Sequence, residues 1–300
     1  MADLNHTEWK GNTGGKPWMQ VFMAKTFRYI PLCILYWCMG WVIPFYMLFS
    51  RQGYHWAFQY FHKHRGYNRL KSFIWVYFNH FRMGQVVIDR FAMYSGKRFK
   101  IVQDGQELFN ELSEQESGFM QLSSHVGNYE LAGYSLVSKN KTFTALVFGG
   151  ETAQVMDGRK EMFADKRLQM VPVSADLSHI FALNNALAEG NIVSMTGDRI
   201  FGSQKHVLCD FMGSKARFPM GPYAMAVQRG VPVLAVFVMK ESIHTYHIYV
   251  RKIQLPEGVT LKRNEKMAAL AQAFAHELEL VMDKYPAQWY NYYDFWKQDD

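Results

Sequence analysis

From residue 99 onward, short apolar runs alternate with longer amphipathic segments, and this alternation limits the fold more than any other feature of the chain. Runs of β-branched and aromatic residues predict strands, and apolar residues at every third or fourth position predict helices. Strands that alternate with helices favour an α/β fold, with a single largely parallel sheet flanked by helices. We expect strands at 99–103, 118–123, 142–148, 168–173, 192–196, 206–212, 231–239 and 245–253, and helices at 129–137, 153–166, 177–189, 222–229 and 264–285.

A long apolar stretch precedes this region, because residues 29–50 carry no charged side chain. A hydrocarbon core of about 30 Å takes roughly 20 helical residues, so the stretch is long enough to cross a bilayer. Pro31 and Pro44 interrupt a simple spanning helix and leave a re-entrant or interfacial anchor open as the alternative. We expect a polar N-terminal segment over 1–26 and a transmembrane or re-entrant anchor over 27–50.

The next segment, residues 51–97, mixes aromatic and basic side chains at roughly helical spacing, as at Phe73, Tyr77 and Phe81. Two interpretations stay open. The segment forms either a pair of amphipathic helices lying on the bilayer or a helical hairpin packed on the domain that follows. We expect membrane-proximal helices here and one α/β domain over 98–300.

The charge balance points to an acidic partner, because the formal net charge is +7 at pH 7. A nucleic-acid-binding chain would carry its lysines and arginines in a stripe with exposed aromatic residues. Here the basic residues flank the apolar stretch instead, which favours an anionic membrane surface or an acidic carrier protein and excludes nucleic acid. The three cysteines show no Cys-x-x-Cys spacing, so we expect no disulfide framework and a reducing, cytoplasmic setting.

The residue pattern with the clearest chemistry is Ser-Ser-His-Val-Gly-Asn-Tyr-Glu, residues 123–130, between an expected strand and an expected helix. Imidazole titrates near neutrality, so His125 is a candidate general base. Glu130 would orient the imidazole ring, or would simply stabilise the helix N-terminus. The amide of Gly127 is a candidate oxyanion donor. Asn128 is expected to cap the helix, with donation to the transition state as the alternative.

Three further blocks follow in order: Asp198-Arg199 after a strand, Phe218-Pro-Met-Gly221, and an apolar run that opens with Val231-Pro232. Together with the histidine block, they resemble the glycerophospholipid acyltransferase superfamily over nearly the whole chain. The resemblance is strongest to the late acyltransferases of lipid A synthesis, and within them to predicted acyltransferases of aryl polyene clusters, which end in an aromatic segment like residues 286–296.

The chain departs from the superfamily pattern at two places. Met220 and Tyr223 stand where glycerol-3-phosphate and lysophosphatidate acyltransferases carry Glu and Arg, which puts a glycerophosphate acceptor in doubt. Residues 147–151 replace the Tyr-Arg-Pro-type segment of lipid A enzymes, which puts lipid A itself in doubt.

The resemblance implies a membrane-associated bacterial acyltransferase that moves an acyl chain from an acyl carrier protein or coenzyme A thioester to a hydroxyl of a lipid-like acceptor. His125 would be the base and Glu130 its partner, with no covalent acyl-enzyme. The expected location is the cytoplasmic (inner) membrane, with the active site facing the cytoplasm. The implied substrate-binding residues are Gly127, Asn128, Asp198, Arg199, Lys215, Arg217, Phe218 and Gly221.

Several alternatives remain open. Asp198 and Arg199 would otherwise form a purely structural pair, and Lys215 and Arg217 a solvated surface. The acceptor group is a hydroxyl or, in an aminolipid enzyme, an amine. A non-catalytic lipid-binding protein and a thioesterase are the other rivals. No cofactor is expected, and no metal, because the tract at 62–64 lacks a third ligand at suitable spacing.

Overall fold

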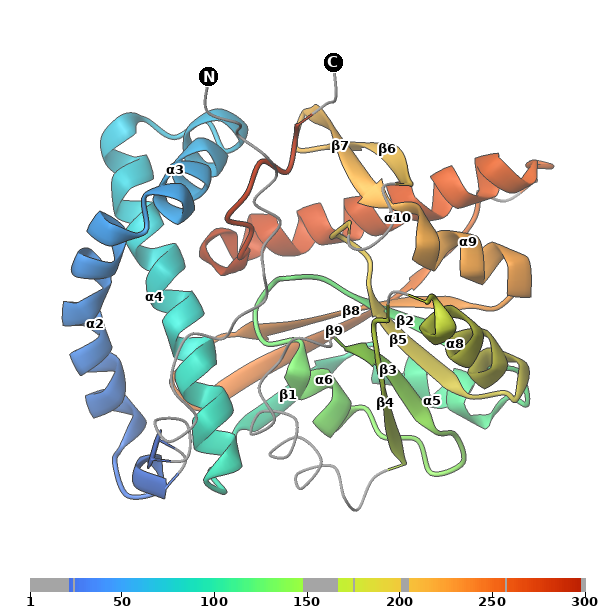
Figure 1. Cartoon of the computed structure of the whole chain (residues 1–300), viewed down its shortest axis with the longest axis horizontal. Helices are drawn as coiled ribbons and strands as arrows, with labels where there is room; N and C mark the ends of the chain where they lie inside the picture. Colours follow the sequence, from blue (N-terminus) through green and yellow to red (C-terminus); the bar gives the residue numbers. More distant parts are fainter. Residues whose placement is uncertain are drawn as a thin grey trace.

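The computed structural model describes residues 22–23, 25–147, 167–174, 176–200, 205–256 and 258–297, with residues 133 and 134 described by their backbone alone. Its centre is a seven-stranded sheet in the order β1-β9-β8-β2-β5-β3-β4 (Figure 1). The pairings are parallel except between β8 and β9, which confirms the expected α/β class with a largely parallel sheet. The strands are β1 (Lys100–Asp104), β2 (Phe119–Ser123), β3 (Phe143–Val147), β4 (Leu168–Pro172), β5 (Ile192–Thr196), β8 (Val233–Lys240) and β9 (Thr245–Ile253).

Helices cover both faces of the sheet, so its central strands are apolar on both sides. Every residue of β2 and β8 is buried. Along β8, Phe237 joins a core with α8, α9 and α10, whereas its neighbour Val236 joins a core with α5 and α6. Figure 1 shows α10 above the sheet and α6 below it. These helices are α5 (Gln106–Glu114), α6 (Glu130–Ser135), α8 (Ser178–Ala188), α9 (Met220–Arg229) and α10 (Arg263–Lys284).

The structure also contains one strand that the sequence analysis did not expect. β7 (Ser214–Pro219) pairs antiparallel with β6 (His206–Phe211) in a separate hairpin. The two-residue turn uses Met212 and Gly213, both with positive φ, as a tight hairpin turn requires. The expected helix at 153–166 lies outside the described residues.

The N-terminal helices pack on this domain as well as on one another. They are α2 (Leu32–Phe49), α3 (Arg51–Gln59), the π-helix η1 (Tyr60–His64) and α4 (Arg69–Tyr94). Phe61 and Val76 belong to the same core as β8 and α10. Asn79 of α4 donates to the carbonyls of Ala287 and Trp289, so α4 also holds the C-terminal tail (residues 286–296).

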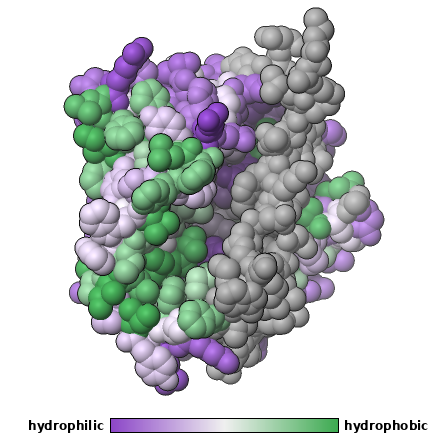
Figure 2. All heavy atoms as spheres, turned by 60° about the vertical axis from the view of Figure 1, so that its left-hand side comes forward, coloured by the Kyte–Doolittle hydropathy of each residue, from purple (hydrophilic) through white to green (hydrophobic). Residues whose placement is uncertain are grey.

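Among the described helices, α2 is the one that is long and apolar enough to cross a membrane, with a mean hydropathy of 1.8. One side of α2 is buried, at Leu32, Tyr36, Ile43 and Met47. The other side is exposed, and Figure 2 shows apolar side chains gathered on the part of the surface that α2 and α4 form. The exposed apolar residues here include Trp37, Trp41, Phe45, Leu48 and Phe49 on α2 and Leu70, Phe73, Ile74 and Phe78 on α4.

Candidate active site

The candidate site forms where two neighbouring parallel strands end. β2 and β5 pair in a register that places Ser123 opposite Thr196. His125 lies two residues beyond the end of β2, and Asp198 lies two residues beyond the end of β5. The carboxyl ends of parallel strands collect functional groups at one edge of a sheet. Because the two strands end in register and each site residue lies two positions after its strand, His125 and Asp198 come together, although 73 positions separate them in the chain.

Asp198 is fully buried and accepts three hydrogen bonds. Its Oδ1 lies 2.8 Å from His125 Nδ1. Its Oδ2 accepts from the His125 backbone amide at 2.8 Å and from the Ser124 hydroxyl at 2.6 Å. Burial by itself would raise the pKa of Asp198, but the neighbouring His125 and Arg199 and these hydrogen bonds lower it to about 2. Asp198 is therefore a carboxylate at neutral pH and can only accept hydrogen bonds.

His125 is partly accessible, with a side chain 18% exposed. Burial lowers its pKa below 6.5, and the nearby Arg199 lowers it further, against the opposing effect of Asp198. A neutral ring beside a carboxylate acceptor carries its proton on Nδ1, which leaves Nε2 as the basic nitrogen. This arrangement is suited to taking a proton from a substrate.

Glu130 does not hold the Nδ1 atom of His125, contrary to the expectation from the sequence. Its Oε1 pairs with Arg90 of α4 at 2.8 Å, and both side chains are largely buried. The reason lies in the sheet register, which places Asp198 against Nδ1. The pair of Glu130 and Arg90 instead joins the first turn of α6 to α4.

The loop of residues 125–128 is held by backbone hydrogen bonds on both sides. Gly127 N–H donates to the Gln288 carbonyl at 2.9 Å, so this amide is already used and does not match the expected role of oxyanion donor. Asn128 N–H donates to Val238 O at 2.7 Å, while its side chain makes no helix cap, contrary to expectation, and donates to Tyr246 Oη at 3.5 Å. Gly127 has φ +51, and an added Cβ would lie 1.9 Å from Val238 O, so only glycine fits.

Arg199 follows Asp198 and reaches the C-terminal tail. Its Nη2 donates to Asn291 Oδ1 at 3.0 Å, and to the carbonyl of Tyr290 at 3.4 Å. The guanidinium carbon lies 5.3 Å from the centre of the Tyr293 ring. Tyr290 N–H in turn donates to His125 O at 2.9 Å. The tail thus contacts both halves of the candidate site.

The remaining residues that the sequence singled out lie in the β6–β7 hairpin or in α9. Phe218 is fully buried and stacks edge-on against Phe211, so here it is a core residue. Lys215 forms an exposed pair with Asp210 at 2.8 Å. Arg217 is half-buried on β7, and Gly221 lies in the first turn of α9.

Several residues that shape this site were not expected from the sequence. Ser124 was quoted but given no role. Tyr223 was noted only as a departure, yet its buried hydroxyl donates to Gly197 O at 2.7 Å and holds the turn before Asp198. Gln288 and Asn291 lie far away in sequence, and no local pattern marks them. Within the part of the chain that the structure describes, no cluster of three metal-ligating side chains is present.

Comparisons with known proteins identify the family of this chain. Residues 75–298 match the model of the family described as bacterial lipid A biosynthesis acyltransferase. Phosphatidylinositol mannoside acyltransferases from two strains of Mycobacterium tuberculosis are each 24% identical over 180 residues, which is 58% of this chain and 53% of theirs. The chain thus matches about half the length of these curated relatives.

Among solved structures, the 1-acyl-sn-glycerophosphate acyltransferase PlsC from Thermotoga maritima aligns over 87% of this chain and 100% of its own, with 13% identity and a TM-score of 0.37. The family model covers well over half of the chain and includes both His125 and Asp198. The chain therefore belongs to the bacterial lipid A biosynthesis acyltransferase family.

Proposed function

We propose that this protein transfers an acyl chain from an acyl carrier protein or coenzyme A thioester directly to a hydroxyl of a lipid-like acceptor. The observation that carries the proposal is the contact between His125 Nδ1 and the buried carboxylate of Asp198. A neutral imidazole held in one tautomer by a carboxylate is the arrangement of a general base. Family membership supports acyl transfer as the reaction.

In the proposed mechanism, His125 Nε2 takes the proton of the acceptor hydroxyl while the oxygen of that hydroxyl attacks the thioester carbonyl. Asp198 stabilises the imidazolium that forms. The tetrahedral intermediate then expels the thiolate, and the imidazolium returns the proton to the sulfur. No covalent acyl-enzyme is formed. The guanidinium of Arg199, half-buried beside the histidine, is the cation best placed to stabilise the oxyanion or an oxygen-rich head group.

We further propose that the surface formed by α2 and α4 brings the site to the cytoplasmic face of the bacterial inner membrane. The exposed aromatic and aliphatic residues of α2 and α4 form an apolar surface that a bilayer would cover. α2 is fixed to α4, because the Tyr36 hydroxyl donates to the buried carboxylate of Asp89 on α4. Asp89 also pairs with Lys240 of β8, which joins both helices to the α/β domain. The division into a polar segment, an anchor over 27–50, membrane-proximal helices over 51–97 and an α/β domain from residue 98 forms part of this proposal.

The test uses membranes that contain wild-type protein or His125→Ala at matched levels, with His276→Ala as the control because His276 is an exposed histidine of α10. Labelled acyl carrier protein and coenzyme A thioesters are supplied separately with a total lipid extract, and products are followed by mass spectrometry. We expect a new acylated lipid from the wild type and the control, reduced at least a thousandfold by His125→Ala.

Other outcomes would separate the rival functions. Label that appears only as free acid would indicate a thioesterase. Label on an amine would indicate an aminolipid enzyme. Equal product from wild type and His125→Ala would refute the general-base mechanism.

A further inference from the structure

The apolar helix α2 is docked on the rest of the molecule along its whole length. Its buried residues recur at helical spacing from the first turn to the last, at Leu32, Tyr36, Ile43 and Met47. The first two pack in one core cluster with Ala92 of α4, and the last two belong to the core that contains β8 and α10. Figure 1 shows α2 beside α4, with α4 between α2 and the sheet.

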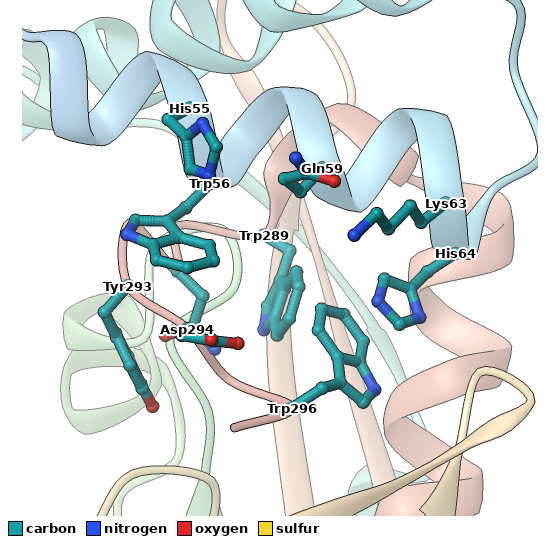
Figure 3. A pocket seen from close by; sticks show the side chains of 10 residues that line it. His55, Trp56, Gln59, Lys63, His64, Trp289, Tyr293, Asp294 and Trp296 are labelled. Atoms are coloured by element: carbon teal, nitrogen blue, oxygen red, sulfur yellow. The ribbon is translucent and has the colours of Figure 1, made fainter. Parts of the chain in front are cut away.

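Both ends of α2 are also held on the domain. Before the helix, the carbonyl of Ile30 accepts from Lys97 Nζ at 2.8 Å. After the helix, α3 and η1 lie against the C-terminal tail, and Figure 3 shows their side chains facing those of the tail. The rings of His64 and Trp296 stack there, with centres 3.4 Å apart. Because 18 helical residues extend about 27 Å, a spanning α2 would carry one end away from these contacts to the far side of the bilayer.

The middle of α2 is fixed to α4 by close contacts as well. The Tyr36 hydroxyl donates to the carboxylate of Asp89, which pairs with Lys240 in a fully buried position. Met39 lies against Gly84, where an added Cβ would collide with the Met39 sulfur. A helix that left α4 to cross the bilayer would lose these contacts, whereas a helix in the plane of the membrane keeps them.

The exposed apolar surface belongs to two helices side by side. On α4 the exposed residues Leu70, Phe73, Ile74 and Phe78 form one stripe. Figure 2 shows apolar side chains gathered on the surface that α2 and α4 form. A groove of about 660 Å³ opens between the two helices, and none of its lining residues, which include Trp41, is charged. A bilayer that covers α2 must therefore cover the adjoining face of α4, which a lone spanning helix does not require.

The charges around this surface are all positive. From residue 22 to residue 88 the sequence contains eight lysines and arginines and no aspartate or glutamate. The exposed ones include Lys25 and Arg28 before α2, Arg51 after it, and Arg69 and Lys71 at the start of α4. Anionic phospholipid head groups attract such residues, whereas a second copy of this chain would bring the same charge and be repelled. The partner that fits the surface is therefore an anionic lipid leaflet.

The positions of these charges also distinguish an in-plane helix from a spanning one. Spanning helices carry their excess of lysine and arginine on the cytoplasmic side. Here Lys25 and Arg28 stand at one end of α2 and Arg51 at the other, so a spanning α2 would expose basic residues on the wrong side in either orientation. In an in-plane helix, both ends lie at the head groups of the same leaflet and the conflict disappears.

We propose that α2 lies in the plane of the membrane, beside α4, immersed in one leaflet that contains anionic phospholipid, and does not cross to the other side. Residues 25 and 51 are then on the same side of the membrane as the α/β domain. This inference rests on the proposed membrane attachment. Combined with the proposed acyl transfer, it makes the acceptor a lipid of that same leaflet.

The test places single thiols in the full chain. Cys33 and Cys38 are exposed and are replaced by alanine, whereas Cys209 is buried and can stay. Burial raises the pKa of the Cys209 thiol to about 12, so a maleimide does not label it at pH 7. The Tm of each variant verifies that it is folded.

The first measurement determines the side of the membrane on which each end of α2 lies. Lys25→Cys, Arg51→Cys and, as the control on α10, His276→Cys are treated with a membrane-impermeant maleimide in intact spheroplasts and in inverted membrane vesicles of a bacterial host. All three positions are exposed. We expect all three thiols to react in the inverted vesicles, with loss of labelling in the spheroplasts.

Other labelling patterns separate this inference from the proposed function. Lys25→Cys that reacts in spheroplasts while His276→Cys does not would show a spanning helix, which overturns the in-plane position and keeps the membrane attachment. Lys25→Cys that reacts from neither side would also overturn it, because residue 25 would then lie in the hydrocarbon. His276→Cys that reacts in spheroplasts, or protein absent from the membrane fraction, would instead refute the location in the proposed function.

The second measurement determines depth by spin-label accessibility to oxygen and to a water-soluble nickel chelate, in nanodiscs that contain phosphatidylglycerol. Labels at Ile34, Trp41 and Leu48 follow one exposed side of α2, Phe73 represents α4, and Leu280 is the matched exposed residue of α10. We expect the first four labels at a common depth of about 5–10 Å and Leu280 in water. A maximum at Trp41, about 15 Å deep in the middle of the hydrocarbon, with Phe73 in water, would refute the proposal.

The third measurement concerns the charge of the lipid. The share of protein that floats with phosphatidylglycerol-containing vesicles is compared with the share that floats with zwitterionic vesicles. Arg69→Gln/Lys71→Gln should weaken binding to the anionic vesicles about fivefold for each charge removed. Arg263→Gln/Lys266→Gln, which removes two exposed charges from α10, should not. Equal binding of wild type to both kinds of vesicle would exclude the preference for anionic lipid.

Discussion

Replacement of Asp198 by asparagine changes the state of His125 without a change of shape. The Oδ2 position of Asp198 faces two donors, the backbone amide of His125 and the hydroxyl of Ser124. The backbone amide cannot turn to become an acceptor, so the oxygen of the new amide must occupy this position. Its NH₂ group then faces His125 Nδ1, which has to accept. The proton of the ring moves to Nε2, and the base that faces the substrate is lost.

Loss of the correct tautomer costs about 10³- to 10⁴-fold in kcat in a histidine–carboxylate system. This corresponds to about 4–5.5 kcal/mol in the activation free energy. The assay is single-turnover transfer from a labelled thioester, with near-ultraviolet circular dichroism and the Tm to verify the fold. Between pH 5 and 8, the wild-type rate should fall on acidification through the His125 pKa, which lies below 6.5. Asp198→Asn should stay low across that range.

Glu130→Gln is the comparison variant, because its amide oxygen can still accept from Arg90. We expect a loss of no more than about tenfold, the scale of one weakened hydrogen bond. A fall of less than tenfold for a folded Asp198→Asn protein, or a larger fall for Glu130→Gln, would refute the assignment of Asp198 as the partner of His125.

Three further predictions concern stability. Gly127→Ala should lower the free energy of unfolding by at least about 2 kcal/mol, measured by urea denaturation, because its methyl group would lie 1.9 Å from Val238 O and φ is positive; an unchanged midpoint would contradict this. The pKa of about 2 for Asp198, against an ordinary 3.8, adds about 2 kcal/mol of stability that is present above pH 3.8 and is lost as the pH falls towards 2. The difference in unfolding free energy between wild type and Asp198→Asn should therefore be smaller at pH 2 than at pH 5. An equal difference at both pH values would exclude the effect. Lys240→Met removes the cation that pairs with the buried carboxylate of Asp89, whose oxygen lies 2.6 Å from Lys240 Nζ, and should lower the free energy of unfolding by about 3–5 kcal/mol in the same assay. Recovery of stability in Lys240→Met/Asp89→Leu would assign the loss to the unpaired charge.

Much of the fold could be read from local pattern. The strands Ile192–Thr196 and Thr245–Ile253 were expected at the residues where they occur, because both are rich in β-branched, aromatic and other apolar residues. The strand Ser214–Pro219 was missed because it belongs to a two-stranded hairpin and carries charged residues at alternate positions. Its turn at Met212-Gly213 was the available signal.

Among the site residues, local sequence identified His125 because a histidine directly after a buried strand is a distinct pattern. The same reasoning assigned its partner by proximity along the chain and chose Glu130. The partner at Nδ1 is Asp198, because β2 and β5 are neighbours in register and each site residue lies two positions beyond its strand. Strand neighbours depend on how the whole sheet is assembled, and no short segment contains that information.

The sequence by itself determined the α/β class, the apolar N-terminal helix and the histidine that we propose as the base, because each follows from the periodicity or chemistry of adjacent residues. Only the tertiary structure decided what the base contacts and what surrounds it. The side chain of the tail residue Asn291 accepts a hydrogen bond from Arg199, which lies 92 positions away in the chain. The Gln288 carbonyl accepts a hydrogen bond from the backbone amide of Gly127. The physical reason is that hydrogen bonds between distant segments depend on packing of the complete chain, whereas helix and strand periodicity depends on nearest neighbours.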